Sequence, residues 1–111
     1  MSYSHKSLVA EKWKELLLIE QMANIGAEIG RAINWRKKEK EEYSQQAFFR
    51  GLELLSLTIN DSKNKKGCLK ELCRLYEILG DYFIGDNEYN SSDDFFEKYF
   101  LAFNFAARLK S

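Results

Sequence analysis

Apolar residues recur along the chain at intervals of three and four positions, which is the spacing of an amphipathic α-helix. Polar stretches interrupt this pattern at residues 38–40, 60–67 and 85–92, and the last two are rich in Asn, Asp, Ser and Gly. The sequence contains no proline, and it has no runs of β-branched residues. It therefore predicts an all-α protein with helices over about 7–37, 41–59, 68–84 and 93–109.

We expect these helices to form one antiparallel four-helix bundle over residues 1–111, with residues 1–6 disordered. A length of 111 residues fits a single domain. Short connections favour antiparallel packing of helices that follow one another in sequence. The first predicted helix is the longest, and Gly26 and Gly30 near its middle predict a kink at that point.

The first predicted helix also changes its apolar face partway along. Trp13, Leu16 and Leu17 share one side of its first half, whereas its second half is apolar on roughly the opposite side. A bundle made by one chain covers a single side of each helix, so a second apolar stripe needs a partner. The last helix has a surplus stripe as well. The two stripes are Met22, Ile25, Ile29 and Ile33, and Leu101, Phe105 and Leu109. They predict a homodimer, or a surface for another protein.

Polar residues occupy the side of the first helix that the apolar residues leave. They are Glu20, Asn24, Glu28 and Arg31, with Arg50 and Glu53 of the second helix as further candidates. Two interpretations are open: a polar ligand site inside the bundle, or a solvated face of ion pairs. Metal sites between helices usually include Glu-x-x-His pairs. The single histidine of the chain is His5, so the sequence predicts no metal and no cofactor.

Residues 86–97 have the length of a calcium-binding loop between two helices. The candidate ligands are Asp86, Glu88, Asn90 and Glu97. However, Ser91 stands at the sixth position, where that motif needs glycine, and Asp93 stands at the usually apolar eighth position. These departures favour the alternative, an acidic turn that caps the next helix.

Lysines gather at residues 63–70, and Arg74 follows them. They predict a small anion-binding patch or, alternatively, a solvated turn, and no aromatic residue lies among them to stack on bases. The 17 basic residues of the chain are balanced by 17 acidic ones, and the balance holds in both halves. This balance argues against broad electrostatic binding to nucleic acid or to an anionic membrane.

Cys68 and Cys73 lie five positions apart on a predicted helix. At about 100° per residue they point roughly 140° apart, which disfavours a disulfide. We therefore expect reduced thiols and a cytoplasmic protein. No apolar run approaches the roughly 18 residues of a membrane span, and no nucleophile has a nearby histidine other than His5. These features indicate a protein outside the membrane and favour a non-enzymatic role.

Four segments together resemble a family of small all-helical prokaryotic proteins whose activity is not known. They read ANIGAEIGRAINW (23–35), AFFRGLELLSLTI (47–59), ELCRLYEILGDYF (71–83) and YFLAFNFAAR (99–108). The resemblance implies a helical bundle and no particular activity. The leading hypothesis is a non-enzymatic interaction or self-associating module. The alternative is a nucleic-acid-associated domain of the kind encoded beside nucleotidyltransferases or in toxin–antitoxin pairs. A small-ligand site on the polar stripe is a third hypothesis.

Overall fold

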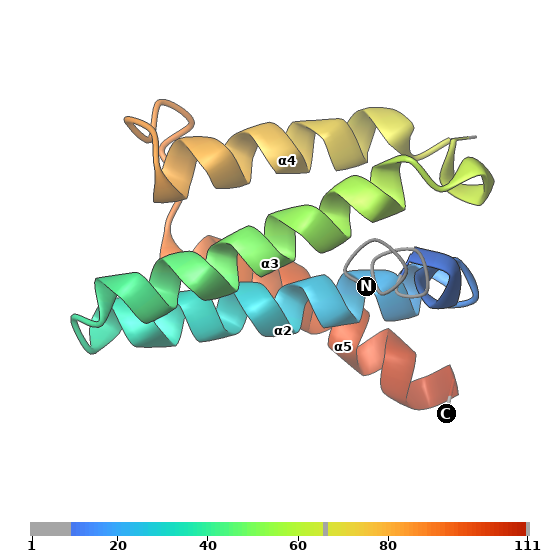
Figure 1. Cartoon of the computed structure of the whole chain (residues 1–111), viewed down its shortest axis with the longest axis horizontal. Coiled ribbons are helices and arrows are strands. Elements are labelled where there is room, and N and C mark those ends of the chain that lie inside the picture. The colour runs from blue at the N-terminus through green and yellow to red at the C-terminus, as the bar shows by residue number, and fades with distance from the viewer. Residues whose placement is uncertain (1–9, 66, 111) are drawn as a thin grey trace, which may run out of the picture.

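The computed structural model describes residues 10–65 and 67–110, and these ranges contain helices and no strand. The elements are α2 (Leu18–Lys37), α3 (Glu41–Ile59), the 3₁₀ turn η1 (Ser62–Asn64), α4 (Leu69–Phe83) and α5 (Asp93–Lys110) (Figure 1). A shorter helical segment at residues 10–14 precedes α2. The all-helical prediction is confirmed, and the ends of α3, α4 and α5 agree with the predicted ends to within one residue.

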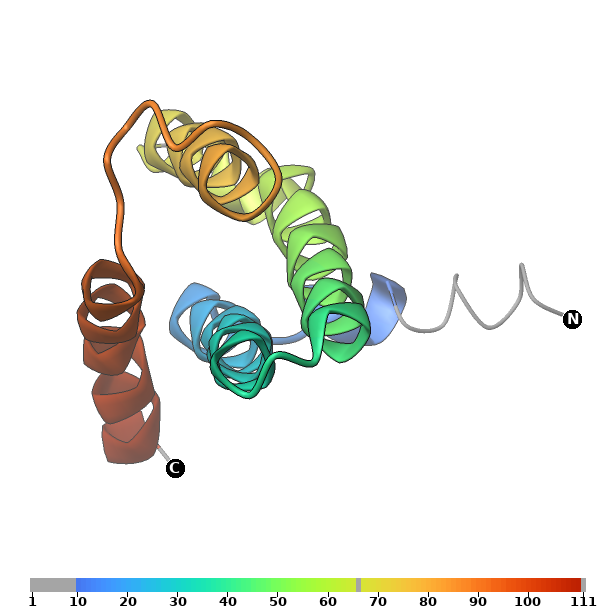
Figure 2. The same ribbon diagram turned by 90° about the vertical axis from the view of Figure 1, so that its left-hand side faces the viewer.

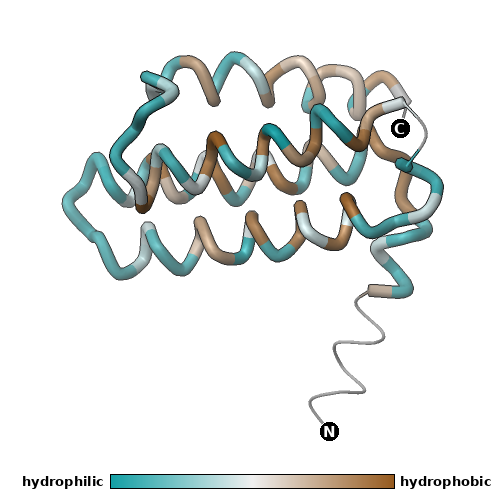
Figure 3. Tube along the Cα trace, turned by 90° about the horizontal axis from the view of Figure 1, so that it is seen from above, coloured by the Kyte–Doolittle hydropathy of each residue, from teal (hydrophilic) through white to brown (hydrophobic). Residues whose placement is uncertain are grey.

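The long helices form a curved row in the order α5, α2, α3 and α4 (Figure 2). α2 packs against both α3 and α5, and α3 packs against α4. The Ser44 hydroxyl, for example, donates a hydrogen bond to the Ala32 carbonyl at 2.7 Å. Aromatic side chains fill the space between α4 and α5, where the ring centroids of Tyr82 and Phe96 lie 5.2 Å apart. The polar connection from α2 to α3 lies where α2 ends and α3 begins, at the left of Figure 3.

Three helices are joined at that end by Asp93, the first residue of α5. One of its carboxylate oxygens accepts a hydrogen bond from the Tyr82 hydroxyl at 2.6 Å and lies 3.2 Å from the Arg36 guanidinium. Arg36 also stacks over the Tyr82 ring, with its guanidinium carbon 4.6 Å from the ring centroid. Burial raises the pKa of Tyr82, and the hydrogen bond to Asp93 adds to this effect. Arg36 and Asp93 therefore attach the end of α2 to the start of α5.

The predicted single helix over 7–37 is wrong, because the chain leaves helical geometry at residues 15–17. Leu17 is extended, with φ −67° and ψ 154°, and α2 begins directly after it. α2 is helical without interruption through Gly26 and Gly30, the two positions at which a kink is predicted. The predicted helix start at residue 7 and the predicted disorder at 1–6 lie outside the described residues.

The apolar stripe predicted to be surplus on the first helix belongs to the core of the chain itself. Its members are all buried: Met22, Ile25, Ile29 and Ile33. The interface role predicted for these four residues is therefore wrong. The break at residues 15–17 gives the physical reason. The segment 10–14, which contains Trp13, runs in a different direction from α2. The apolar sides of both segments can therefore face the same core.

Candidate functional site

The polar stripe lies on the outside of α2. The Glu20 carboxylate accepts a hydrogen bond from the Leu17 N–H at 2.9 Å, so Glu20 satisfies a backbone group at the start of the helix. The Asn24 amide donates to the Glu20 carbonyl at 2.9 Å, and Asn24 itself is exposed. Both residues therefore have local roles in the helix.

Glu28 is at the centre of the charged part of this stripe. One of its carboxylate oxygens lies 3.2 Å from the Arg31 guanidinium and 3.3 Å from the Arg50 guanidinium. The Glu28 side chain is only 16% exposed, but both arginine side chains are more than half exposed, and Glu53 is exposed as well. The arrangement matches a solvated face of ion pairs, and it links α2 to α3.

The loop at residues 85–92 is organised around Asp81, which lies in the last turn of α4. The Asp81 carboxylate accepts hydrogen bonds from the Glu88 and Tyr89 N–H groups at 2.8 and 3.0 Å. Of the predicted calcium ligands, Asp86 and Asn90 are exposed.

The fourth predicted calcium ligand, Glu97, lies away from the loop. It belongs to α5, where its carboxylate is 3.9 Å from Lys37. Within residues 10–65 and 67–110, no group of three or more His, Cys, Asp or Glu residues is placed to hold a metal ion. The structure thus does not bring the calcium candidates together.

A cluster of buried polar side chains fastens residues 10–17 to the rest of the chain. The Trp13 indole donates a hydrogen bond to the Thr58 hydroxyl at 2.9 Å. The Gln21 amide donates to the Trp13 carbonyl at 2.9 Å and to the Asp61 carboxylate at 3.2 Å. The Asn64 amide donates to the Gln21 side-chain oxygen and to the Thr58 carbonyl, each at 3.0 Å. These bonds stabilise the break between residues 10–14 and α2.

Asp61 is the acidic member of this cluster, and Lys63 forms an ion pair with it. Burial acts to raise the pKa of Asp61. The hydrogen bonds from Lys63 and Gln21 outweigh burial, so the pKa is below its ordinary value of 3.8. No buried side-chain nitrogen or oxygen of the described residues lacks a hydrogen-bond partner. A fully satisfied cluster of this kind fits a structural role rather than a ligand site.

The sequence reasoning missed this cluster, although one signal for it was present. Gln21 falls on the apolar side of α2, in line with Leu18 and Ile25. A polar residue in such a position is buried only when it has hydrogen-bond partners. Its partners come from residues about 40 positions further along the chain, and no local pattern identifies them.

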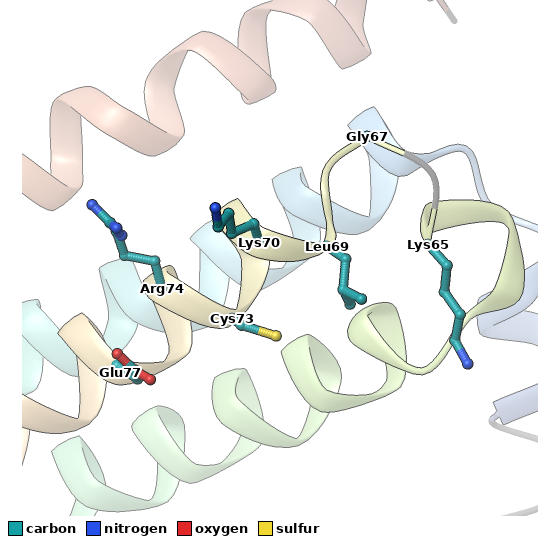
Figure 4. A pocket seen from close by; sticks show the side chains of 7 residues that line it. All are labelled: Lys65, Gly67, Leu69, Lys70, Cys73, Arg74 and Glu77. Atoms are coloured by element: carbon teal, nitrogen blue, oxygen red, sulfur yellow. The ribbon is translucent and has the colours of Figure 1, made fainter.

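A basic hollow of about 670 Å³ lies beside the start of α4. Lys65, Lys70 and Arg74 contribute its positive charge, and Cys73 and Glu77 also line it (Figure 4). Within residues 10–65 and 67–110, none of the three basic side chains forms an ion pair. Figure 4 shows Lys65 and Arg74 pointing away from each other. The hollow therefore attracts anions in general but does not surround one.

Both cysteines are free thiols. Cys73 is exposed, whereas Cys68 is half-buried and donates to the Asn64 carbonyl at 3.0 Å. The two thiols therefore differ in accessibility.

An apolar stripe runs along the outer face of α5. Leu101, Phe105 and Leu109 are 62%, 64% and 75% exposed, and their spacing of four places them on one side of the helix. Phe96 and Phe100, on the other side of α5, are buried in the core. The α5 stripe is therefore a continuous apolar surface that the described part of the chain leaves open, as predicted for these three residues.

No known family model matches the chain, and no curated protein or solved structure is significantly similar to it. Among the helices of the described residues, none combines the length and the apolar character needed to cross a bilayer.

Proposed function

We propose that this protein is a non-enzymatic interaction module that associates with a second copy of itself through the α5 stripe. We also propose that its fold is an antiparallel four-helix bundle. The protein would work in a reducing, cytoplasmic setting, in which Cys68 and Cys73 remain free. The exposure of Leu101, Phe105 and Leu109 on one face carries the proposal. Fully burying a side chain of this size contributes about 1.5–3 kcal/mol, against which the cost of association must be set.

The experiment is a mass measurement by size-exclusion chromatography with light scattering over a range of concentrations. Wild type is expected to exceed the 13.1 kDa of one chain, and Phe105→Glu is expected to remain at that mass because a buried charge disfavours the contact. Tyr89→Glu is the matched control, since Tyr89 is also an exposed aromatic residue but lies in a loop. A wild type that stays at 13.1 kDa throughout contradicts the proposal.

The second candidate is nucleic-acid binding, and the basic hollow favours it. Lys65, Lys70 and Arg74 offer positive charge to a phosphate backbone. The zero net charge of the chain makes this candidate the weaker of the two. A gel-shift assay with duplex and single-stranded probes tests it. Binding that weakens steeply with salt and is lost in Lys70→Glu/Arg74→Glu supports it, whereas no shift at low salt excludes it.

A further inference from the structure

A second exposed apolar surface lies between α3 and α4. It is a shallow groove of about 540 Å³, with Phe49 and Leu57 on the α3 side and Tyr76, Gly80 and Ile84 on the α4 side. Phe49, Tyr76 and Ile84 are 51%, 40% and 60% exposed. The chain therefore has both an unpartnered helix stripe and an unpartnered groove between two helices. Recognition of an amphipathic helix by such a groove is a recurring mode of binding.

The groove and the α5 stripe have the same length. Tyr76 and Ile84 are eight residues apart, which corresponds to about 12 Å along a helix, and Ile84 directly follows the last residue of α4. Leu101 and Leu109 are eight residues apart on α5. The two ends of the stripe can therefore lie over the two ends of the groove.

Gly80 leaves a hole in the middle of the groove. A Cβ atom at Gly80 would have no neighbour within 4 Å outside the backbone of its own helix. Tyr76 and Ile84, one turn away on either side, are large and exposed. The groove thus has free space at its centre, and the central residue of the α5 stripe is its bulkiest, Phe105. A large side chain opposite a hole is the pattern of knobs-into-holes packing.

One exposed charge beside each surface has the opposite sign to the other. Glu53 lines the groove and is exposed, and it forms no ion pair with another described residue. Arg108 lies next to Leu109 on α5 and is exposed. Opposite charges at the edge of an apolar contact fix its register and favour this pairing over others.

We infer that the α5 stripe of one copy docks in the α3–α4 groove of a second copy, with Phe105 over Gly80. This inference rests on the proposed function and names the surface that receives the stripe. Because stripe and groove are different patches, the contact is heterologous, and each pair retains one free stripe and one free groove. Wild type therefore grows into rings or chains. The interface is small, so the association is weak.

Two variants separate the two halves of the contact. Phe105→Glu removes the stripe and keeps the groove, whereas Gly80→Leu fills the groove and keeps the stripe. Both positions are outside the core, and leucine favours a helix more than glycine does. Arg74→Leu is the control, because it adds the same side chain to α4 in the basic hollow, away from the groove. Circular dichroism checks that each variant is folded. Sedimentation velocity then measures each variant alone and the two in a 1:1 mixture, up to roughly 1 mM.

We expect each variant alone to associate at least about tenfold more weakly than wild type. The mixture is expected to regain one contact and stop at a pair with twice the 13.1 kDa of one chain. Arg74→Leu is expected to assemble like wild type. If Gly80→Leu assembles like wild type while Phe105→Glu does not, this inference is overturned and the proposed function stands. A mixture that remains monomeric also overturns the inference, and a monomeric wild type overturns both.

Discussion

Gly26 and Phe100 meet where α2 packs against α5, and a Cβ atom on Gly26 would lie only 2.7 Å from the Phe100 Cβ. Gly30, one turn further along α2, is different. A Cβ atom there would have no neighbour within 4 Å outside the backbone of its own helix. The two glycines of the segment 23–35 thus have separate roles, since close helix packing requires only the first of them.

Gly26→Ala is therefore expected to destabilise the protein, and Gly30→Ala to stabilise it. The added methyl group at Gly26 overpacks the contact with Phe100, which costs about 1–3 kcal/mol. The same change at Gly30 has free space and reduces the entropy of the unfolded chain, so it contributes about 0.5–1 kcal/mol of stability. Urea unfolding followed by circular dichroism measures both free energies. Equal effects at the two sites would contradict the packing described for α2 and α5.

Asp61→Asn is expected to lower the free energy of unfolding by about 1–3 kcal/mol near neutral pH, because it removes a charged hydrogen-bond acceptor from a buried cluster. The pKa of Asp61 is lower in the folded chain than its ordinary value of 3.8. Between the folded and the unfolded pKa of Asp61, the unfolded chain therefore binds more protons than the folded chain. The stabilisation is complete above the unfolded value and is lost as the pH falls through the folded one.

The test of this pH dependence compares wild type and Asp61→Asn by urea unfolding at neutral pH and at about pH 3. The difference between the two proteins should shrink in acid. A difference that stays constant over this interval would show that the Asp61 charge does not stabilise the cluster.

Glu28→Ala is expected to reduce stability by less than about 1 kcal/mol, because ion pairs whose cationic partners are open to solvent contribute little. Glu28 lies close to Arg31 and Arg50, and both of these side chains are more than half exposed. The loss should be smaller still at high salt, which screens charges at the surface. A loss of about 3–5 kcal/mol would instead indicate a buried pair. Thermal or urea unfolding at two salt concentrations distinguishes these outcomes.

Local patterns predicted the helices well where a turn sequence limits them, as with Asn60 before η1 and Ser92 before α5. They failed at residues 15–17, where neither proline nor glycine marks the end of a helix. The break depends on hydrogen bonds such as the one from Trp13 to Thr58, which are 45 positions apart. Because the first helix was predicted to be uninterrupted, the apolar residues of α2 had no place in the predicted core and were assigned to an interface.

The candidate surfaces show the same limit. The spacing of Leu101 and Phe105 identifies the α5 stripe without knowledge of the fold. The groove, in contrast, needs α3 and α4 side by side, and the space at Gly80 is visible only once Tyr76 and Ile84 are placed. Periodicity predicts a helix face, but a groove formed by two helices depends on their packing.

Cys73 is expected to react with a thiol reagent much faster than Cys68. Cys73 is exposed, whereas Cys68 is half-buried and donates to the Asn64 carbonyl, so the reagent reaches the Cys73 thiol more readily. Ellman's reagent should give a fast and a slow phase of equal size under native conditions. Cys73→Ser should remove the fast phase. Two equally fast thiols would contradict the packing of Cys68 against η1.

Tyr99 is expected to make stability fall at alkaline pH. Its hydroxyl donates to the Glu71 carboxylate at 3.3 Å. Burial, together with the negative charge of Glu71, raises the pKa of Tyr99 from 10.0 to about 12. The folded chain therefore keeps a proton that the unfolded chain releases. The stabilisation is complete below the unfolded value and is lost as the pH rises through the folded one.

Urea unfolding at several pH values across this window should show a shallower decline for Tyr99→Phe than for wild type. Tyr43→Phe is the control, because Tyr43 is exposed and its hydroxyl makes no hydrogen bond to a carboxylate of the described residues, and it should follow wild type. Parallel declines for wild type and Tyr99→Phe would mean that the contact between Tyr99 and Glu71 is absent in solution.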